Sequence, residues 1–199
     1  RCRSAPWRGS SSGRRGSHDI DVLITGVGMV ATGAYTARAL ARGAYDLAFN
    51  AGVCGSFDPV LVPGTVVHVI RDRIAGLGAE DGERFLPIED LGLGHSGEVV
   101  NAAPPPIAPL DALPRVRAIS VNTVHGTESS IAAARARYAP DVESMEGAAF
   151  AFACAISHVP YAQVRAVSNV VERRNRAAWR MELAIRHLDD AILEILDQT

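Results

Sequence analysis

Short apolar segments alternate with helical segments along residues 19–199, and this alternation constrains the fold more than any other feature of the sequence. Apolar runs typical of buried strands occupy residues 20–25, 46–50, 66–70, 116–121 and 161–167, and helical periodicity covers residues 29–42, 128–138, 145–157 and 177–197. This order predicts an α/β fold, with a mostly parallel or mixed twisted central sheet flanked by helices. Ligands of such sheets bind at the carboxyl ends of the strands, so the residues that directly follow each strand are the first site candidates.

Residues 1–18 differ from the rest of the chain. They are mainly Ser, Gly and Arg, with five of the 20 basic residues and no acid, which predicts a disordered or atypical N-terminal tail. We expect residues 19–199 to form a single domain. Within it, residues 71–116 are rich in Gly, Pro and charge, and the prolines of residues 104–114 indicate an excursion at the surface.

The composition excludes several classes of function. All 20 basic residues are Arg, so lysine Schiff-base chemistry and a Walker-type phosphate loop are excluded. Beyond residue 18 there are 15 Arg against 22 acids, a balance that does not favour nucleic-acid binding. The apolar runs are too short for a membrane span. Three widely spaced Cys without a CxxC pair predict no structural metal and a reducing, cytoplasmic location.

Two glycine-bearing segments follow the first two predicted strands. The segment GVGMVA at residues 26–31 contains Gly28 and fits a dinucleotide-binding fingerprint, but the acid that this fingerprint needs is on the wrong side, because Asp46 opens the second strand. The second segment, a predicted turn over residues 52–55, begins at Gly52. Such turns offer backbone N–H groups to an anion or a ribose, or simply meet a need for positive φ.

Two carboxylates stand near the start of the predicted helix 145–157. Glu143 and Glu146 flank Met145 in the sequence ESMEG. An acid in a first helical turn is common because it interacts favourably with the helix dipole. The same residues also suit a sugar site, since a carboxylate can accept hydrogen bonds from two ribose hydroxyls and a thioether can pack on the ring.

The last predicted strand ends in a charge, a hydroxyl and an amide: Arg165, Ser168 and Asn169. A buried Arg needs a partner because an unpaired buried charge is costly. The Asn amide carries a donor and an acceptor, enough to bind a purine edge. The arginines that begin with Arg173 are either a solvated cluster or a clamp for an anionic part of the ligand.

Four segments, ITGVGM, FNAGVCG, VESMEGAAF and RAVSNVVERRNRAAW, resemble in order and spacing the nucleoside phosphorylase/nucleosidase superfamily, and within it the futalosine hydrolase family. The similarity runs from about Asp19 to the C-terminus, and the last two segments are the specific ones. The resemblance implies a homo-oligomeric enzyme without a cofactor. Its reaction would be hydrolysis of the N-glycosidic bond of futalosine, which releases hypoxanthine and leaves dehypoxanthinylfutalosine.

The resemblance also implies roles for single residues. Glu146 would hold the ribose hydroxyls with Met145 against the sugar, Ser168 and Asn169 would contact the purine, and Arg165 would help to fix the attacking water. Related adenine-specific nucleosidases carry Asp where this chain has Asn169. Because an Asn amide can donate to a 6-oxo group and accept from a protonated ring nitrogen, we expect hypoxanthine rather than adenine as the base.

The chain departs from the family at its beginning. Relatives have a further strand ahead of residue 20 that supplies a water-positioning acid, and here the Arg/Ser/Gly tail occupies that place. Four alternatives therefore stay open: a purine nucleoside phosphorylase, a methylthioadenosine/S-adenosylhomocysteine nucleosidase, a non-catalytic nucleotide-binding module, and an inactive truncated paralogue. The hydrolase hypothesis requires Glu146 and Asn169 to converge on opposite ends of one nucleoside.

Overall fold

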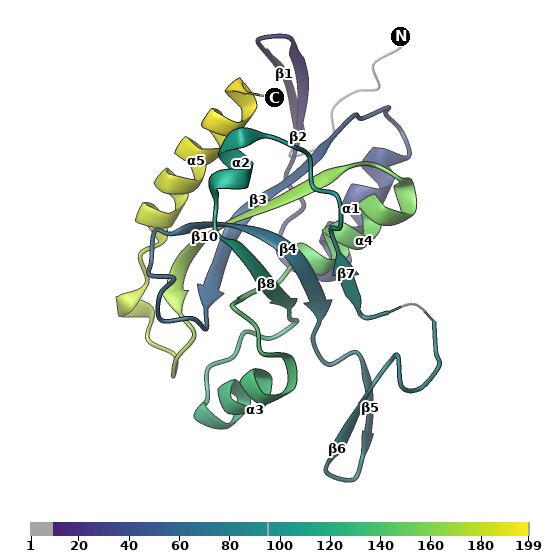
Figure 1. Ribbon diagram of the computed structural model, residues 1–199, viewed down its shortest axis with the longest axis vertical. Coiled ribbons are helices and arrows are strands. Elements are labelled where there is room, and N and C mark those ends of the chain that lie inside the picture. The colour runs from purple at the N-terminus through teal and green to yellow at the C-terminus, as the bar shows by residue number, and fades with distance from the viewer. Residues whose placement is uncertain (1–9, 95, 199) are drawn as a thin grey trace.

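The computed structural model describes residues 10–94 and 96–198, and Figure 1 shows their arrangement. The strands are β1 (Ser10–Arg15), β2 (His18–Leu23), β3 (Ala48–Ser56), β4 (Val66–Ile74), β5 (Gly78–Asp81), β6 (Arg84–Pro87), β7 (Glu98–Val100), β8 (Arg115–Ser120), β9 (Val142–Ser144) and β10 (Tyr161–Val170). The helices are α1 (Met29–Leu40), α2 (Ala108–Ala112), α3 (Glu128–Tyr138), α4 (Gly147–Ser157), the 3-10 helix η1 (Arg176–Ala178) and α5 (Met181–Asp197).

A mixed six-stranded sheet forms the centre of the molecule, in the order β10-β3-β9-β8-β4-β7. The pairs β10–β3, β4–β8 and β8–β9 are parallel, and β3–β9 and β4–β7 are antiparallel. Strand β10 also pairs with β4, so that β10, β3, β9, β8 and β4 close on themselves. With helices on the outside, this arrangement confirms the predicted α/β fold.

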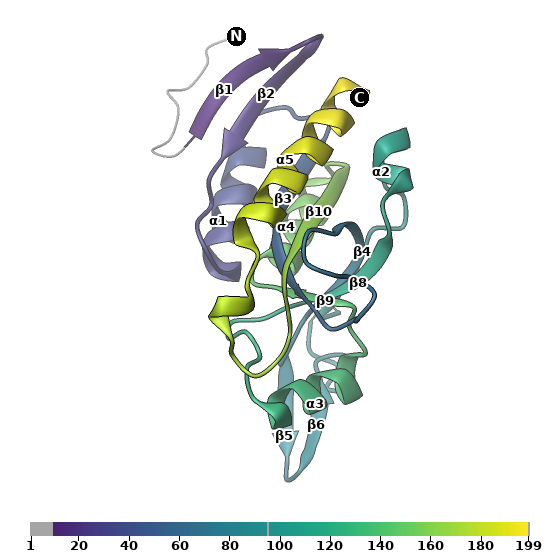
Figure 2. The same cartoon turned by 90° about the vertical axis from the view of Figure 1, so that its left-hand side faces the viewer.

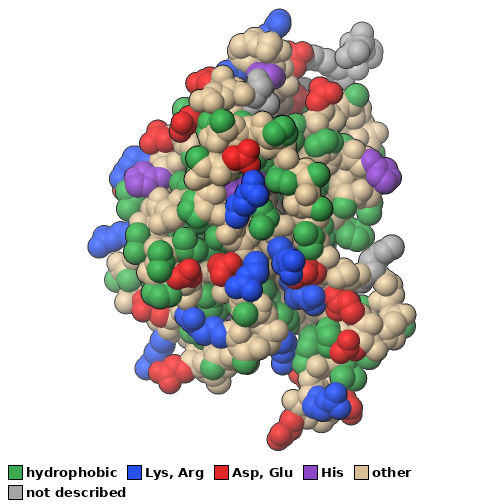
Figure 3. Space-filling model, in the orientation of Figure 1, with side chains coloured by type: hydrophobic (Ala, Val, Ile, Leu, Met, Phe, Trp, Pro, Cys, Tyr) green, Lys and Arg blue, Asp and Glu red, His purple; other side chains and the backbone are tan. Residues whose placement is uncertain are grey.

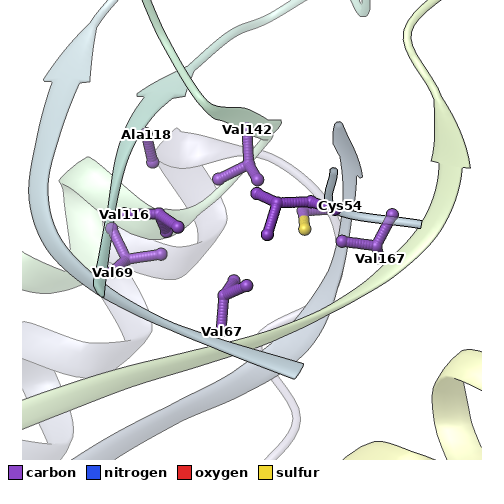
Figure 4. Packing of buried hydrophobic residues seen from close by; sticks show 8 residues of the cluster. Cys54, Val67, Val69, Val116, Ala118, Val142 and Val167 are labelled. Atoms are coloured by element: carbon purple, nitrogen blue, oxygen red, sulfur yellow. The ribbon is translucent and has the colours of Figure 1, made fainter. Parts of the chain in front are cut away.

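The interior of the closed strands is filled by small apolar side chains. In Figure 4 these side chains, drawn from all five strands, point toward one another. They are Cys54, Val67, Val69, Val116, Ala118, Val142 and Val167, and each is at most 5% exposed. β-branched residues suit such positions because they pack well on a pleated surface and lose little rotamer freedom there. This packing holds the carboxyl ends of β3 and β10 in fixed relation.

Helices cover the outside of the closed strands (Figures 1 and 2). Helix α5 packs on β10 and β3, and α4 packs on the opposite side together with α1. The proline-rich segment predicted as a surface excursion packs against α5 through α2. Ile107 and Leu110 are 5% and 0% exposed in the same apolar cluster as Leu188 of α5, so the prediction of a surface excursion is wrong for these two side chains.

The tail over residues 1–18 was predicted to be disordered or atypical; residues 10–18 are not disordered, an atypical tail stays open, and residues 1–9 lie outside the described residues. Strands β1 and β2 form an antiparallel hairpin with Ser10 opposite Leu23. Figure 2 shows the hairpin beside the end of α5, where Arg15 Nε lies 2.7 Å from Asp197 Oδ1. The sequence of β1, SSSGRR, is polar and has no apolar alternation, so it gave no strand signal. The single domain over residues 19–199 stays a prediction.

The predicted glycine turn over residues 52–55 is also wrong. Strand β3 runs unbroken from Ala48 to Ser56 and pairs in parallel with β10 along its length. A Cβ on Gly52 would collide with the guanidinium of Arg165. Glycine is needed here because a neighbouring side chain crosses the bare backbone, and not because the chain reverses direction.

Acidic and basic side chains are interspersed on the face shown in Figure 3. The arginines at positions 71, 73, 115 and 117 each have a guanidinium nitrogen within 3.6 Å of a carboxylate oxygen. Within the part of the chain that the structure describes, no helix combines the length and the hydropathy that crossing a bilayer requires.

Candidate active site

Glu146, the residue immediately before α4, is the centre of the first candidate cluster. Its Oε1 accepts a hydrogen bond from the Gly28 N–H at 3.1 Å, and its Oε2 accepts one from the Met145 N–H at 3.3 Å. Gly28 has φ 100° and ψ 153°, a conformation that favours glycine, so the loop ahead of α1 can turn its N–H toward the carboxylate. The side chain of Glu146 remains 18% exposed and can reach a ligand.

Arg165 provides the positive charge of this cluster. It lies on β10, its side chain is 3% exposed, and its Nη1 is 3.4 Å from Glu146 Oε2. The guanidinium crosses strand β3 at Gly52, where no side chain obstructs it. Its Nε and Nη2 are buried and have no hydrogen-bond partner among the described residues. The expectation that a buried Arg finds a partner is confirmed, and two of its nitrogens remain without an acceptor among the described residues.

Asn169 lies four residues further along β10, beyond a β-bulge between Val167 and Asn169. Its Nδ2 donates to the Val170 carbonyl at 2.9 Å, and its Oδ1 lies 2.8 Å from the Ser168 hydroxyl. The Ser168 hydroxyl is also 3.1 Å from the Cys54 carbonyl oxygen. The Asn169 amide is therefore oriented by its neighbours, which fixes which of its atoms donates and which accepts.

Asn169 opens into a pocket, which we call the amide pocket. Its lining residues are Gly55, Val124, His125, Glu143, Asn169, Val170, Glu172, Arg174, Asn175 and Trp179. A Cβ on Gly55 would lie 3.3 Å from Asn169 Nδ2 and 3.6 Å from Glu143 Cγ, so these two side chains flank the bare backbone of β3. Arg174 stacks on Trp179, with its guanidinium carbon 5.7 Å from the ring centroid. The pocket thus combines an aromatic wall with polar groups, as small-molecule sites do.

Glu143 and His125 form a pair inside the amide pocket. Glu143 Oε1 accepts from the backbone N–H of His125 at 3.1 Å, and Glu143 Oε2 is 2.5 Å from His125 Nδ1. The Glu143 side chain is 4% exposed and the His125 side chain is 17% exposed. Burial raises the pKa of Glu143 above its ordinary value, and the hydrogen bonds from His125 oppose that rise. The imidazole ring is further held by an edge contact with Phe57, at 6.0 Å between centroids.

The buried carboxylate of Asp72 is linked to the first turn of α4 by hydrogen bonds. Asp72 on β4 is 2% exposed, and it accepts hydrogen bonds from the Ser120 hydroxyl at 2.9 Å and from Gln163 Nε2 at 2.8 Å. Ser120 Oγ in turn accepts the Ala148 N–H of the first turn of α4. Burial raises the pKa of Asp72 to about 6, against the opposing effects of Gln163, Ser120 and Arg165. This network connects the sheet to the helix that Glu146 precedes.

Replacing Asp72 with asparagine is expected to change how stability depends on pH. Because the folded-state pKa, about 6, lies above the ordinary value of 3.8, the native state binds more protons between these values. The free energy of unfolding therefore falls as pH rises from about 4 to about 6, by about 2–3 kcal/mol. The Asp72→Asn variant has no carboxylate to ionise at this position, so its free energy of unfolding should not show this fall. Its stability relative to the natural chain should therefore rise by about 2–3 kcal/mol between pH 4 and pH 7.5.

Urea unfolding of both proteins at pH 4 and pH 7.5 measures this difference. Groups common to both chains cancel in the comparison. One such group is His68, which is fully buried and whose pKa burial lowers to about 4. A stability difference that does not vary with pH would mean that Asp72 ionises normally in the folded protein.

The predicted site residues divide into two groups. Glu146, Arg165, Gly28 and Gly52 meet in the first cluster, and Met145, next to Glu146, packs its side chain on an apolar cluster around Phe57. Glu143, Ser168 and Asn169 meet at the amide pocket. Arg173 is exposed and is not among the pocket residues, whereas its neighbour Arg174 lines the pocket.

Sequence reasoning missed His125, Trp179 and Asp72. No aromatic side chain to stack on a base was recognised near residue 125, and the structure brings Trp179 into the pocket from the loop before α5. Trp179 had a sequence signal, because it lies three residues after Arg176, the last residue of the arginine run. Cys54 is excluded as a nucleophile, since burial raises the pKa of its thiol to about 12 and leaves it protonated at neutral pH.

Residues 11–197 match the family model described as the phosphorylase superfamily. The chain is 38% identical over 182 residues to the futalosine hydrolase of Streptomyces coelicolor, covering 86% of this chain and 76% of that protein. It is 34% identical over 197 residues to the futalosine hydrolase of Acidothermus cellulolyticus, covering 94% and 79%. The native structure of Helicobacter pylori futalosine hydrolase has the same fold, with a TM-score of 0.83 at 16% identity, covering 98% of this chain and 87% of that one. The chain therefore belongs to the futalosine hydrolase family of the phosphorylase superfamily.

Proposed function

We propose that this chain hydrolyses the N-glycosidic bond of futalosine, releasing hypoxanthine and leaving dehypoxanthinylfutalosine. One observation carries the proposal beyond family membership. The Glu146–Arg165 cluster and the amide pocket lie along the same two strands, with Gly52 and Gly55 three residues apart on β3. At about 3.3 Å per residue this spacing is roughly 10 Å, which suits a sugar at one end and a purine at the other.

The two clusters support a dissociative reaction. The bond between the ribose C1′ and the base breaks early and the ribose gains oxocarbenium character. The oxygen of a water then bonds to C1′, the water gives up one proton, and the base takes up one proton as it leaves. Glu146 accepts hydrogen bonds from the ribose hydroxyls and stabilises the positive sugar most strongly in the transition state. Arg165 orients the water through its remaining N–H groups, and Asn169 binds the departing purine.

The same proposal includes an assembly and a location. By resemblance we expect a homo-oligomer in the cytoplasm that uses no cofactor, metal ion or nucleic acid, with a small purine nucleoside as its ligand. Arg173, Arg174 and Arg176 are the candidate groups for the carboxylate of futalosine's carboxyphenyl group, since a guanidinium matches a carboxylate in shape and charge.

Incubation with futalosine, inosine and methylthioadenosine, with and without phosphate, tests the function by chromatography of the released base. We expect hypoxanthine from futalosine at a rate that phosphate does not change. Phosphate-dependent release would identify a phosphorylase, and faster release of adenine from methylthioadenosine would identify the other nucleosidase class. No release from any substrate would contradict the proposal, and NADH binding measured by fluorescence would then support a nucleotide-binding module.

A further inference from the structure

The geometry of Glu143 fixes where the proton of the His125 ring is placed. The backbone N–H of His125 can only donate, and it donates a hydrogen bond to Glu143 Oε1 at 3.1 Å. The other carboxylate oxygen of Glu143, Oε2, faces Nδ1 of the His125 ring. When Glu143 is ionised it only accepts hydrogen bonds, so Nδ1 carries a proton, and in the neutral imidazole the second ring nitrogen, Nε2, then presents a lone pair.

His125 is held in the pocket where the base is expected. It lines the amide pocket together with Asn169, and its ring is anchored by Glu143 on one side and Phe57 on the other. A ring restrained in this way loses little freedom when a ligand binds, so a hydrogen bond to it contributes to selectivity. Nε2 is the ring nitrogen that remains for a ligand.

We propose that His125 selects the base: its Nε2 accepts a hydrogen bond from the N1–H of a 6-oxopurine, and Glu143 is the positioning residue that holds the proton of the neutral ring on Nδ1. The proposal rests on the proposed function for its substrate. Adenine carries a lone pair at N1 where hypoxanthine carries a hydrogen, so the two lone pairs would face each other and adenine would be rejected. A site built around such a hydrogen bond discriminates strongly against a base that lacks the donor.

Replacing Glu143 with glutamine should reverse this selection. The carboxamide has only one acceptor, and the backbone N–H of His125 requires it. The NH₂ group then faces Nδ1, which must offer a lone pair, and the ring proton moves to Nε2. Nε2 becomes a donor that matches N1 of adenine and opposes the N1–H of hypoxanthine.

The experiment compares kcat/KM for futalosine and for its 6-aminopurine analogue in the natural chain and in the variants. His125→Phe keeps the ring shape and its contact with Phe57, and should lower the preference for the 6-oxo substrate about 10- to 100-fold. Glu143→Gln should shift the preference toward the 6-amino substrate by at least as much. Glu172→Gln makes the same chemical change in the same pocket without touching His125, and should not shift the preference toward the 6-amino substrate.

Calorimetric binding of free hypoxanthine and adenine to the same proteins separates this inference from the proposed function. If the natural chain releases no base from futalosine, the proposed function fails, while the base preferences still test His125. An unchanged hypoxanthine-to-adenine preference in folded His125→Phe and Glu143→Gln would overturn the inference. A preference that falls in His125→Phe but does not move toward the 6-amino substrate in Glu143→Gln would overturn the positioning role of Glu143.

Discussion

Glu146→Gln is expected to lower kcat for futalosine hydrolysis about 10²- to 10³-fold, with KM changed less than about threefold. Glutamine keeps the size of the side chain and can still accept the Gly28 N–H. It lacks the charge that faces the sugar, and that charge acts mainly when the ribose becomes cationic. Steady-state kinetics give kcat and KM separately, and a thermal melt should show a protein that is still folded, with a lower unfolding temperature because the buried Arg165 loses its charged partner.

Glu128→Gln is the matched control for this prediction. Glu128 is also an acid at the start of a helix, in the first turn of α3, but it is exposed and lies outside both clusters. The control should retain full activity. Unfolding of Glu146→Gln would indicate a structural carboxylate, and full activity of this variant would remove Glu146 from the mechanism.

Asn169→Asp is expected to move substrate preference from hypoxanthine toward adenine nucleosides, by up to about 10⁴-fold in the ratio of kcat/KM values. The Asn amide donates to a 6-oxo group and accepts from a protonated ring nitrogen. A protonated Asp instead donates to the imidazole nitrogen of the purine and accepts from an exocyclic amine. Measuring kcat/KM for futalosine and for its 6-amino analogue gives the ratio directly.

The control for this second prediction is Asn175→Asp, the same change in another residue that lines the amide pocket. It should leave the ratio close to that of the natural chain. An unchanged ratio in Asn169→Asp would show that the amide does not distinguish the bases, and an equal shift in both variants would point to the added negative charge instead.

The sequence predicted a helix or strand correctly where the residues of that element themselves carry the signal for it. The predicted helix 128–138 coincides with α3 because Thr127 and Ser130 form a capping box at its start. The three-residue strand β9 was missed because its pairing with β8 and β3 is long-range and leaves no local pattern. The turn predicted at residues 52–55 failed because a glycine that is needed for close packing looks the same in sequence as one needed for a turn.

The residues of the candidate site divide in the same way, into those with a local sequence signal and those that depend on long-range contacts. Chemistry at strand ends was visible, so Glu146, Arg165 and Asn169 could be named from the sequence. The pairing of His125 with Glu143 could not, because it joins a loop after β8 to β9 across 18 positions. Likewise, the burial of Asp72 depends on Ser120 and Gln163, 48 and 91 positions away.

The β-bulge in β10 affects which residues of this strand can be substituted without disturbing the core. Ahead of it, alternate residues follow the ordinary two-sided pattern, and Val167 fills the interior. The extra residue resets that pattern, so Asn169 turns to the pocket while Val167 keeps its place. The pocket residue and the core residue therefore lie on separate stretches of one strand, and under the proposed function Asn169 can be exchanged without repacking the interior.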